Sequence, residues 1–119
     1  MTDLIVDAAA TLHCVGEDRE LLGELAALFL EECPRQLAGI RAALESHDCH
    51  KLQIAAHTMK GSVSTFGALA ATQAALRLEV LARSGSLAGA EDLLAELELA
   101  LEPVGTVLAG WAAGAAVKS

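Results

Sequence analysis

The chain has 119 residues, of which 54% are hydrophobic and only 3% are aromatic. A domain of this length buries about two thirds of its unfolded surface, so residues 1–119 are expected to form one domain. Its 16 acidic and 8 basic residues give a formal net charge of −8, which disfavours binding to nucleic acid or to an anionic membrane. A core built from Leu, Ala and Val favours an all-α fold.

The cysteines and the chain ends indicate a reduced, cytoplasmic protein. Cys14, Cys33 and Cys49 are odd in number and widely spaced, which argues against a disulfide framework and a zinc ribbon. Segment 1–7 is acidic where a signal peptide is basic. The uncharged run 103–117 is broken by three glycines and is too short for a membrane span, so it is expected to be a packing or frayed tail.

The first half of the chain predicts two helices. A short helix over about 7–14 is ended by Gly16, and Asp18 can cap the next one. Apolar residues then recur at three- and four-residue steps through about residue 44: Leu21, Leu22, Leu25, Leu28, Phe29, Leu37, Ile40 and Leu44. Because the stripe continues past Pro34, one kinked helix is favoured over two abutting helices.

The second half predicts three more helices. Asp48 is the expected N-cap of a helix that ends near 66–67, and another runs over about 68–83. Ser86 can cap a fifth over about 87–101, which a proline then ends. Short connections imply antiparallel neighbours. The sequence therefore predicts an up-and-down antiparallel four-helix bundle with the first short helix as a lid.

The predicted helix 68–83 carries apolar stripes on two opposite sides. One stripe consists of Ala71, Ala74, Ala75, Leu78 and Leu81, and the other of Leu69, Leu76 and Val80. Both stripes cannot face one core. The favoured interpretation is that the C-terminal tail covers the second stripe through Val107, Leu108 and Trp111, and the alternative is a self-association surface. With the stripe covered, a monomer is expected.

The segment His57-Thr58-Met59-Lys60-Gly61-Ser62 predicts an accessible imidazole on a helix. The stripe expected to face the core consists of Leu52, Ala55, Ala56, Met59, Val63 and Phe66. Relative to it, His57 lies at roughly 140°, Gly61 at roughly 180° and Lys60 at roughly 80°. A helical glycine costs about 1 kcal/mol, so Gly61 is interpreted as room for an incoming surface. A solvated histidine beside a packing glycine is the alternative.

These residues resemble the histidine-containing phosphotransfer (HPt) domains of bacterial phosphorelays over about residues 7–101. The resemblance rests on His-x-x-Lys-Gly-Ser from His57, on Gly67, on Leu78-Glu79, and on Phe29-Leu30-Glu31-Glu32 with Pro34. It implies that a receiver-domain phosphoaspartate, which can belong to a hybrid histidine kinase, donates to His57, and that a second response-regulator receiver accepts. Mg²⁺ and the acidic pocket would then belong to the receivers, and this chain would need no cofactor.

The residue types fit phosphoryl transfer. Neutral histidine is a competent nucleophile, and phosphoryl transfer needs mainly positioning and nearby positive charge. Lys60 can supply that charge, and Ser64, two turns from His57, can add a hydroxyl. Ile54 lies at roughly 200° on the same wheel with no core to enter, so it is a candidate docking contact, as is Gly61.

Absent motifs narrow the possible functions. The chain has no P-loop and no kinase nucleotide motif, so we expect a phosphotransfer carrier without its own ATP-dependent kinase activity. His47, Cys49 and His50 have irregular spacing, and no metal site is predicted. Two alternatives stay open: the histidine-bearing module of a chemotaxis-type kinase, and a non-catalytic bundle that only docks on receivers.

Overall fold

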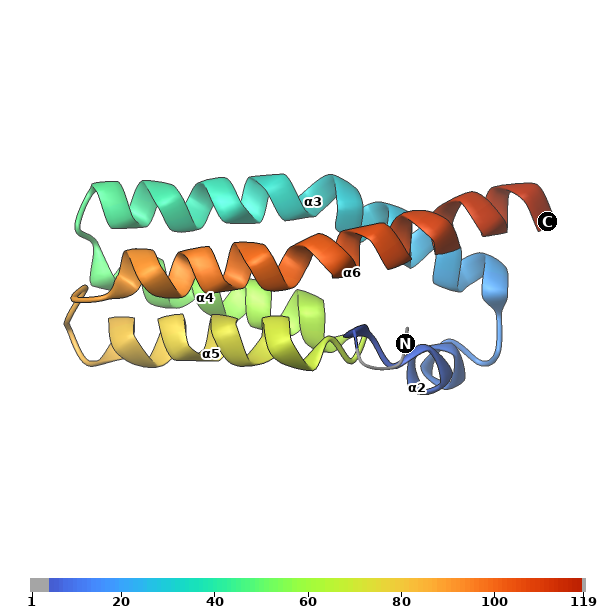
Figure 1. Ribbon diagram of the computed structural model, residues 1–119, viewed down its shortest axis with the longest axis horizontal. Coiled ribbons are helices and arrows are strands. Elements are labelled where there is room, and N and C mark those ends of the chain that lie inside the picture. Colours follow the sequence, from blue (N-terminus) through green and yellow to red (C-terminus); the bar gives the residue numbers. More distant parts are fainter. Residues whose placement is uncertain (1–4, 119) are drawn as a thin grey trace.

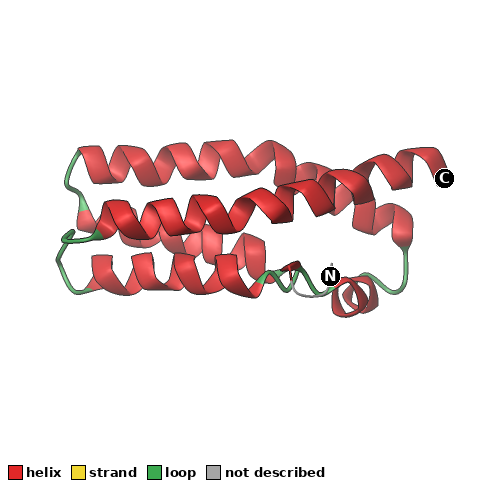
Figure 2. Cartoon of the chain, viewed as in Figure 1, coloured by secondary structure: helices red, strands yellow, loops and turns green. Residues whose placement is uncertain are grey.

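The computed structural model describes residues 5–118, with side chains through residue 114. Within that range the protein is all-helical, with five helices and no strand (Figure 2). The helices are α2 (Ala8–Cys14), α3 (Arg19–Glu45), α4 (Cys49–Ser64), α5 (Leu69–Arg83) and α6 (Ala90–Lys118). The prediction of an all-α fold is confirmed, as is that of a short first helix.

The four long helices lie lengthwise against one another. Contacts join α3 to α4, α4 to α5, α5 to α6 and α6 back to α3, so the apolar faces meet at a common centre. Figure 1 shows α3, α6 and α5 side by side with α4 behind them, and α2 beside the end where α3 begins. The molecule measures 46 × 22 × 21 Å, so α4 and its histidine lie along a long side.

Aspartate side chains begin three of the helices. Asp7, Asp18 and Asp48 precede α2, α3 and α4, and each carboxylate accepts a hydrogen bond of 3.0 Å from the amide three residues later. This bond satisfies an amide that has no partner within the helix, which stabilises a helix by about 1 kcal/mol. The predicted caps Asp18 and Asp48 are confirmed, and Asp48 thereby sets where the histidine helix begins.

Helix α3 passes through Pro34 without a break, as the sequence predicted. Phe29 precedes the proline and Ile40 follows it, and both side chains are buried in the core. Proline removes one backbone hydrogen bond from a helix. Burial of the apolar stripe on both sides of Pro34 offsets that loss, because each fully buried large apolar side chain contributes about 1.5–3 kcal/mol.

The predicted end of the last helix is wrong. Helix α6 begins at Ala90, so Ser86 lies in the preceding connection, and the helix continues through Pro103 to Lys118. The segment expected to be a packing or frayed tail is therefore a packed part of α6. The physical reason is the same as at Pro34: beyond Pro103, Val104 and Leu108 are fully or almost fully buried in the core.

The C-terminal segment does not cover the second stripe of α5, contrary to the favoured interpretation. Leu69, Leu76 and Val80 remain 64%, 40% and 51% exposed. The segment instead packs into the core, where Leu108 is completely buried and the Trp111 ring lies 6.2 Å from that of Phe66. An α-helical continuation of α6 keeps its direction along the bundle and cannot fold back over the outer face of α5.

One close contact joins the start of α2 to the connection between α4 and α5. The Asp7 amide donates to the Phe66 carbonyl at 2.9 Å. Gly67 follows with φ +64°, and a Cβ atom on it would lie 2.6 Å from the Asp7 Cβ. Glycine is therefore required here for both its left-handed conformation and its lack of a side chain. This contact holds the short helix α2 against the connection between α4 and α5.

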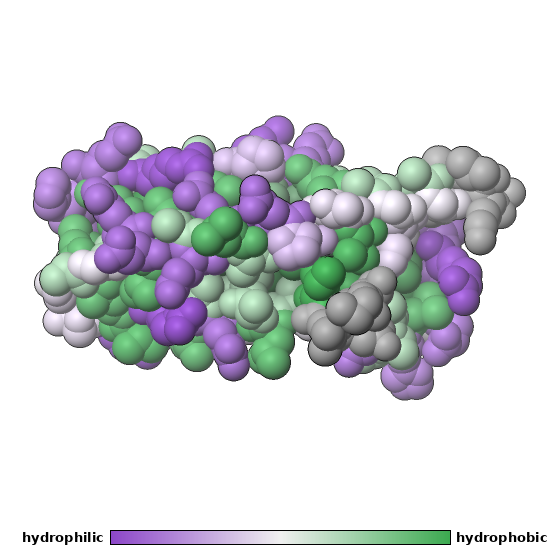
Figure 3. Space-filling model, in the orientation of Figure 1, coloured by the Kyte–Doolittle hydropathy of each residue, from purple (hydrophilic) through white to green (hydrophobic). Residues whose placement is uncertain are grey.

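The surface is mixed in character. Figure 3 shows hydrophilic residues gathered over the half of the visible face where α6 begins, with apolar side chains scattered among them. None of the helices within residues 5–118 combines the length and apolar character that a bilayer crossing needs.

Candidate functional site

His57 lies in the middle of α4 with its side chain 67% exposed. The prediction that this imidazole faces solvent is confirmed. The ring leans toward α5, where its Nδ1 atom lies 3.0 Å from Oε2 of Glu79. The core residues Met59 and Val63 are completely buried on the opposite side of α4, and they fix the rotation of the helix that directs His57 outward.

Glu79 is a buried carboxylate that three nitrogen groups surround. Its side chain is only 4% exposed, although the flanking helix surface is solvated. Oε2 contacts His57 Nδ1 at 3.0 Å and Arg83 Nη2 at 2.8 Å, and Oε1 lies 2.7 Å from Lys60 Nζ. Burial of an ionised carboxylate is costly unless it is paired and hydrogen-bonded. The helical spacings supply the partners: Lys60 follows His57 by three residues, and Arg83 follows Glu79 by four.

The surroundings of Glu79 keep it ionised. The hydrogen bond from Lys60 lowers the pKa of Glu79 most strongly, burial opposes that change, and the hydrogen bond from His57 lowers the pKa further. A carboxylate can only accept hydrogen bonds, so the proton between the two groups belongs to Nδ1 of His57. In the neutral ring the lone pair is then on Nε2, the nitrogen that does not contact Glu79. The contact thus selects one tautomer.

Lys60 lies on the flank of α4, between the core-facing side and His57, which agrees with its predicted position on the helix. Its side chain is 27% exposed, and its ammonium group contacts Glu79. Lys60 and His57 therefore contact the same carboxylate and lie next to each other. The positive charge is held near the imidazole because the lysine side chain is mostly buried.

Gly61 is exposed, and a Cβ atom added to it would meet no atom within 4 Å. The fold of the described chain therefore does not need a glycine here, which removes the alternative of a packing glycine. Ser64 donates its hydroxyl to the Gly61 carbonyl at 3.0 Å, so this hydroxyl is already engaged. Ile54 lies one turn before His57 and is 54% exposed. The structure thus leaves open surface beside the imidazole.

The sequence matches the family model "Hpt domain" over residues 24–106. This range is well over half of the chain and contains His57, Lys60 and Glu79. The chain belongs to the Hpt family. HPt domains carry out histidine phosphotransfer in phosphorelays and interact with the receiver domains of two-component systems. The match begins inside α3 and ends inside α6, so α2 lies outside it. No curated protein and no solved structure matched the sequence.

Glu79 is the residue of this HPt site that the sequence analysis did not assign a role. It entered only as part of the resemblance. Its position in the sequence nevertheless gave a usable signal. Ala75 lies four residues before Glu79, Leu78 one residue before it and Ala82 three residues after it, all on the core-facing stripe, so Glu79 had to lie at the border of the core. A carboxylate at such a position needs a cation, and α4 offered Lys60 and His57.

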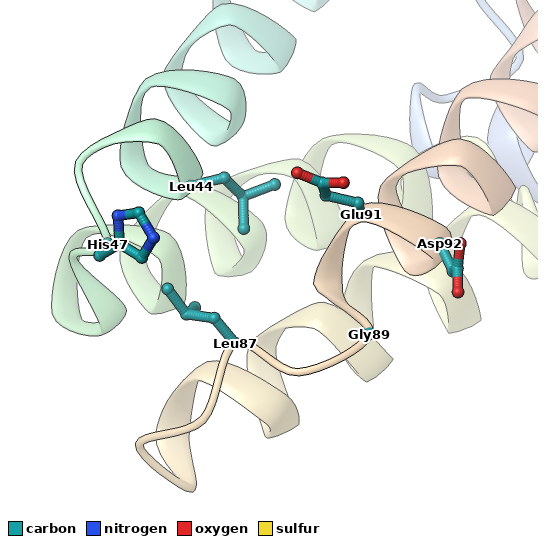
Figure 4. Close-up of a pocket in the computed structure, with 6 residues that line it drawn as sticks. All are labelled: Leu44, His47, Leu87, Gly89, Glu91 and Asp92. Carbon is teal, nitrogen blue, oxygen red and sulfur yellow. The ribbon is translucent and has the colours of Figure 1, made fainter.

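The described cavities of this HPt domain do not include His57. A hollow of about 320 Å³ lies where the α3–α4 and α5–α6 connections meet, and Figure 4 shows its lining. The lining residues are Leu44, His47, Leu87, Gly89, Glu91 and Asp92. The Asp92 carboxylate points away from the His47 ring, and within residues 5–118 no three His, Cys, Asp or Glu side chains are arranged to hold a metal ion. His57 lies on the exposed surface of α4, away from this hollow.

Proposed function

We propose that His57 is the phosphoacceptor of this HPt domain, and that it takes a phosphoryl group from a receiver phosphoaspartate and passes it to an aspartate of another receiver. The observation that carries the proposal is the contact between His57 and Glu79. It anchors Nδ1 on a buried, ionised carboxylate and leaves the lone pair on Nε2 of an exposed ring. An anchored nucleophile on a surface suits transfer between proteins.

The proposed step needs no base on this chain. Nε2 of His57 attacks phosphorus, the bond from phosphorus to the aspartyl oxygen breaks, and the aspartate leaves as a carboxylate. The ring then carries a positive charge, which ionised Glu79 stabilises through the Nδ1 proton. In the second transfer, a carboxylate oxygen of another receiver's aspartate attacks phosphorus, the P–N bond breaks, and its electron pair returns to Nε2, which restores the neutral ring. We expect Mg²⁺ to be bound by the receivers, with no cofactor on this chain.

The neighbours of His57 have proposed roles of their own. Lys60 lies next to the ring, and its ammonium group balances the negative charge of the phosphoryl oxygens. It does so either after leaving Glu79 or while it contacts both Glu79 and the phosphoryl group. Gly61 and Ile54 give the receiver an unobstructed surface with one apolar contact. Ser64 belongs to the same surface, and its hydroxyl has to turn away from the Gly61 carbonyl before it can donate to a phosphoryl oxygen.

We also propose that the four long helices form an up-and-down antiparallel bundle and that the protein acts as a monomeric carrier. Support for the bundle comes from the closed set of contacts, in which α3 and α6 each touch two long neighbours, and from the short connections. In such a bundle the outer faces of α4 and α5 form one continuous side, which gives a receiver direct access to His57.

The test uses two phosphoryl donors. Phosphoramidate, a small donor, is incubated with the chain, and a panel of receivers is incubated after phosphorylation on their aspartates. We expect acid-labile, base-stable label on the wild type with both kinds of donor, and none on His57→Gln. His50→Gln is the matched control, because His50 is exposed near the start of α4. Equal labelling of His57→Gln and the wild type would refute the assignment.

The panel also tests the direction of the relay. Wild type that carries label is mixed with a second, unphosphorylated receiver, and the label is expected to move to that receiver's aspartate. Labelling only by an ATP-dependent kinase domain, with no exchange with any receiver, would instead identify the module of a chemotaxis-type kinase.

A further inference from the structure

The outer face of α5 carries three large apolar side chains that the described chain leaves uncovered. Leu69, Leu76 and Val80, here called the α5 ridge, are 64%, 40% and 51% exposed. Their spacing of seven and four residues puts them on one face of the helix. Single exposed apolar residues are ordinary, but an aligned set is typical of a contact surface.

The ridge begins next to the proposed phosphoacceptor. Val80 directly follows Glu79, which contacts the His57 ring. Leu76 precedes Glu79 by one turn, and the direction of the ridge differs from that of Glu79 by roughly 80° around the helix. On α4, Gly61 lies beside His57 and has no side chain that would obstruct a partner. A protein that approaches Nε2 of His57 therefore comes close to the α5 ridge on the α5 side of the imidazole.

The exposed charged side chains of α5 are both arginines, and each has a carboxylate partner. Arg77 lies 3.5 Å from Glu96 of α6, which is 52% exposed, and Arg83 lies 2.8 Å from Glu79, which is buried. Both arginine side chains are 57% exposed, so two solvent-facing positive groups stand against one solvent-facing carboxylate. By contrast, the outer face of α3 mixes exposed Glu24 and Glu31 with arginines. Two ridges of two identical chains would bring arginine toward arginine, which disfavours self-association. A partner with carboxylates around its contact surface is complementary, and a receiver's Mg²⁺-binding acidic pocket has that chemistry.

We propose that the receiver that exchanges phosphoryl groups with His57 also packs against the α5 ridge, with Arg83 at the border between the ridge and the imidazole. This inference rests on the proposed function and specifies where its partner sits. Apolar contact with Leu76 and Val80 contributes affinity, and the basic border orients the acidic pocket toward Nε2.

The test combines Leu76→Ser with Val80→Ser in one chain. The probe is the receiver with the fastest transfer in the panel above. We expect KM for phosphoryl transfer from that receiver to rise about five- to tenfold, with kcat within about twofold of wild type, because docking and not chemistry is weakened. Leu99→Ser is the matched control: Leu99 is 67% exposed on α6, outside the ridge, and its KM is expected to stay within about twofold.

Phosphoramidate separates this proposal from the proposed function. The double variant is expected to accept phosphoryl groups from phosphoramidate at the wild-type rate, since that donor needs no docking surface. An unchanged KM with the receiver would overturn the ridge proposal while leaving His57 as acceptor. It would also be overturned if sedimentation velocity showed a wild-type dimer that the double variant loses, because the ridge would then bind a second copy. Absence of label on the wild type from both donors would refute the proposed function itself.

Discussion

Glu79 on α5 contacts Nδ1 of His57 on α4 at 3.0 Å, and in doing so it joins the two helices at the exposed imidazole. The carboxylate is nearly inaccessible to solvent, whereas the ring is mostly exposed. One end of this interaction is therefore fixed by the core, and the other is available to a partner. The relationship makes the orientation and the tautomer of the histidine properties of the helix packing.

Glu79→Gln is expected to slow labelling of His57 by phosphoramidate about ten- to hundredfold, which corresponds to the loss of one charge-assisted hydrogen bond. The amide has no charge to retain the proton on Nδ1 or to stabilise the phosphorylated ring. Nitrogen chemical shifts of the ring should show a smaller fraction of the Nδ1-protonated tautomer. Glu96→Gln, at a half-exposed carboxylate on α6, is the control. A wild-type tautomer ratio together with a wild-type rate would contradict the role of Glu79.

Lys60→Ala is expected to slow phosphoryl transfer from a receiver about tenfold or more, because one positive group near the transferred oxygens is lost. The helical content should be unchanged, since the Lys60 stem is partly exposed and Glu79 keeps His57 and Arg83 as partners. Stopped-flow transfer rates and circular dichroism measure the two effects. Lys51→Ala, at an exposed lysine on α4, should transfer normally. Unaltered rates in Lys60→Ala would show that this lysine is a bystander.

Gly61→Gln is expected to weaken receiver binding while leaving the chain folded. Replacing a helical glycine removes a cost of about 1 kcal/mol, and the new Cβ meets nothing within 4 Å, so the variant should unfold at higher urea concentration. Its side chain obstructs the surface beside His57. Titration with a receiver measures the affinity. Gly110→Gln, where a Cβ is also free of contacts, should bind like the wild type. Equal affinities of the two variants would exclude the clearance role of Gly61.

Gly67→Ala is expected to destabilise the protein by about 2 kcal/mol or more, through left-handed backbone strain and overlap with Asp7. Gly16→Ala separates these contributions. Gly16 has φ +67°, close to the +64° of Gly67, but its Cβ would meet nothing within 4 Å. Urea unfolding should therefore show a larger loss for Gly67→Ala. Equal losses would mean that the contact with Asp7 does not matter.

The ionisation of Glu79 predicts a dependence of stability on pH. Its pKa is lowered in the folded protein relative to the ordinary value of 4.5, chiefly by Lys60 and also by His57. The resulting stabilisation is present above the ordinary value and is lost as the pH falls through the lowered one. Urea unfolding should be measured from about pH 7 to about pH 3, a range that includes the ordinary pKa of a carboxyl group. As the pH falls, the free energy of unfolding of the wild type should decrease toward that of Glu79→Gln. Parallel stability curves would contradict this linkage.

Local signals in the sequence predicted the beginnings of α3 and α4 and the face on which the histidine lies. Asp18 and Asp48 cap helices because a short carboxylate can reach an amide three residues on, which requires no distant contact. The exposure of His57 followed from the spacing of Met59 and Val63 around one helix. Pro103 shows where local rules failed, whereas the continuation of the helix through Pro34 was predicted correctly. Both prolines lie inside helices. Beyond Pro103 the glycines interrupt the apolar pattern, so the burial of Leu108 in the core became evident only from the structure.

The order of the residues by itself determined the all-α character, the outward direction of His57 and the family, because these depend on helical periodicity and on a motif within a few turns. Only the tertiary structure decided that Glu79, 22 positions away from His57 in the chain, meets its Nδ1 atom, and that α6 leaves the α5 ridge uncovered. Both outcomes depend on how neighbouring helices are rotated against each other. That rotation is set by the packing of the whole core, and no single helix contains it.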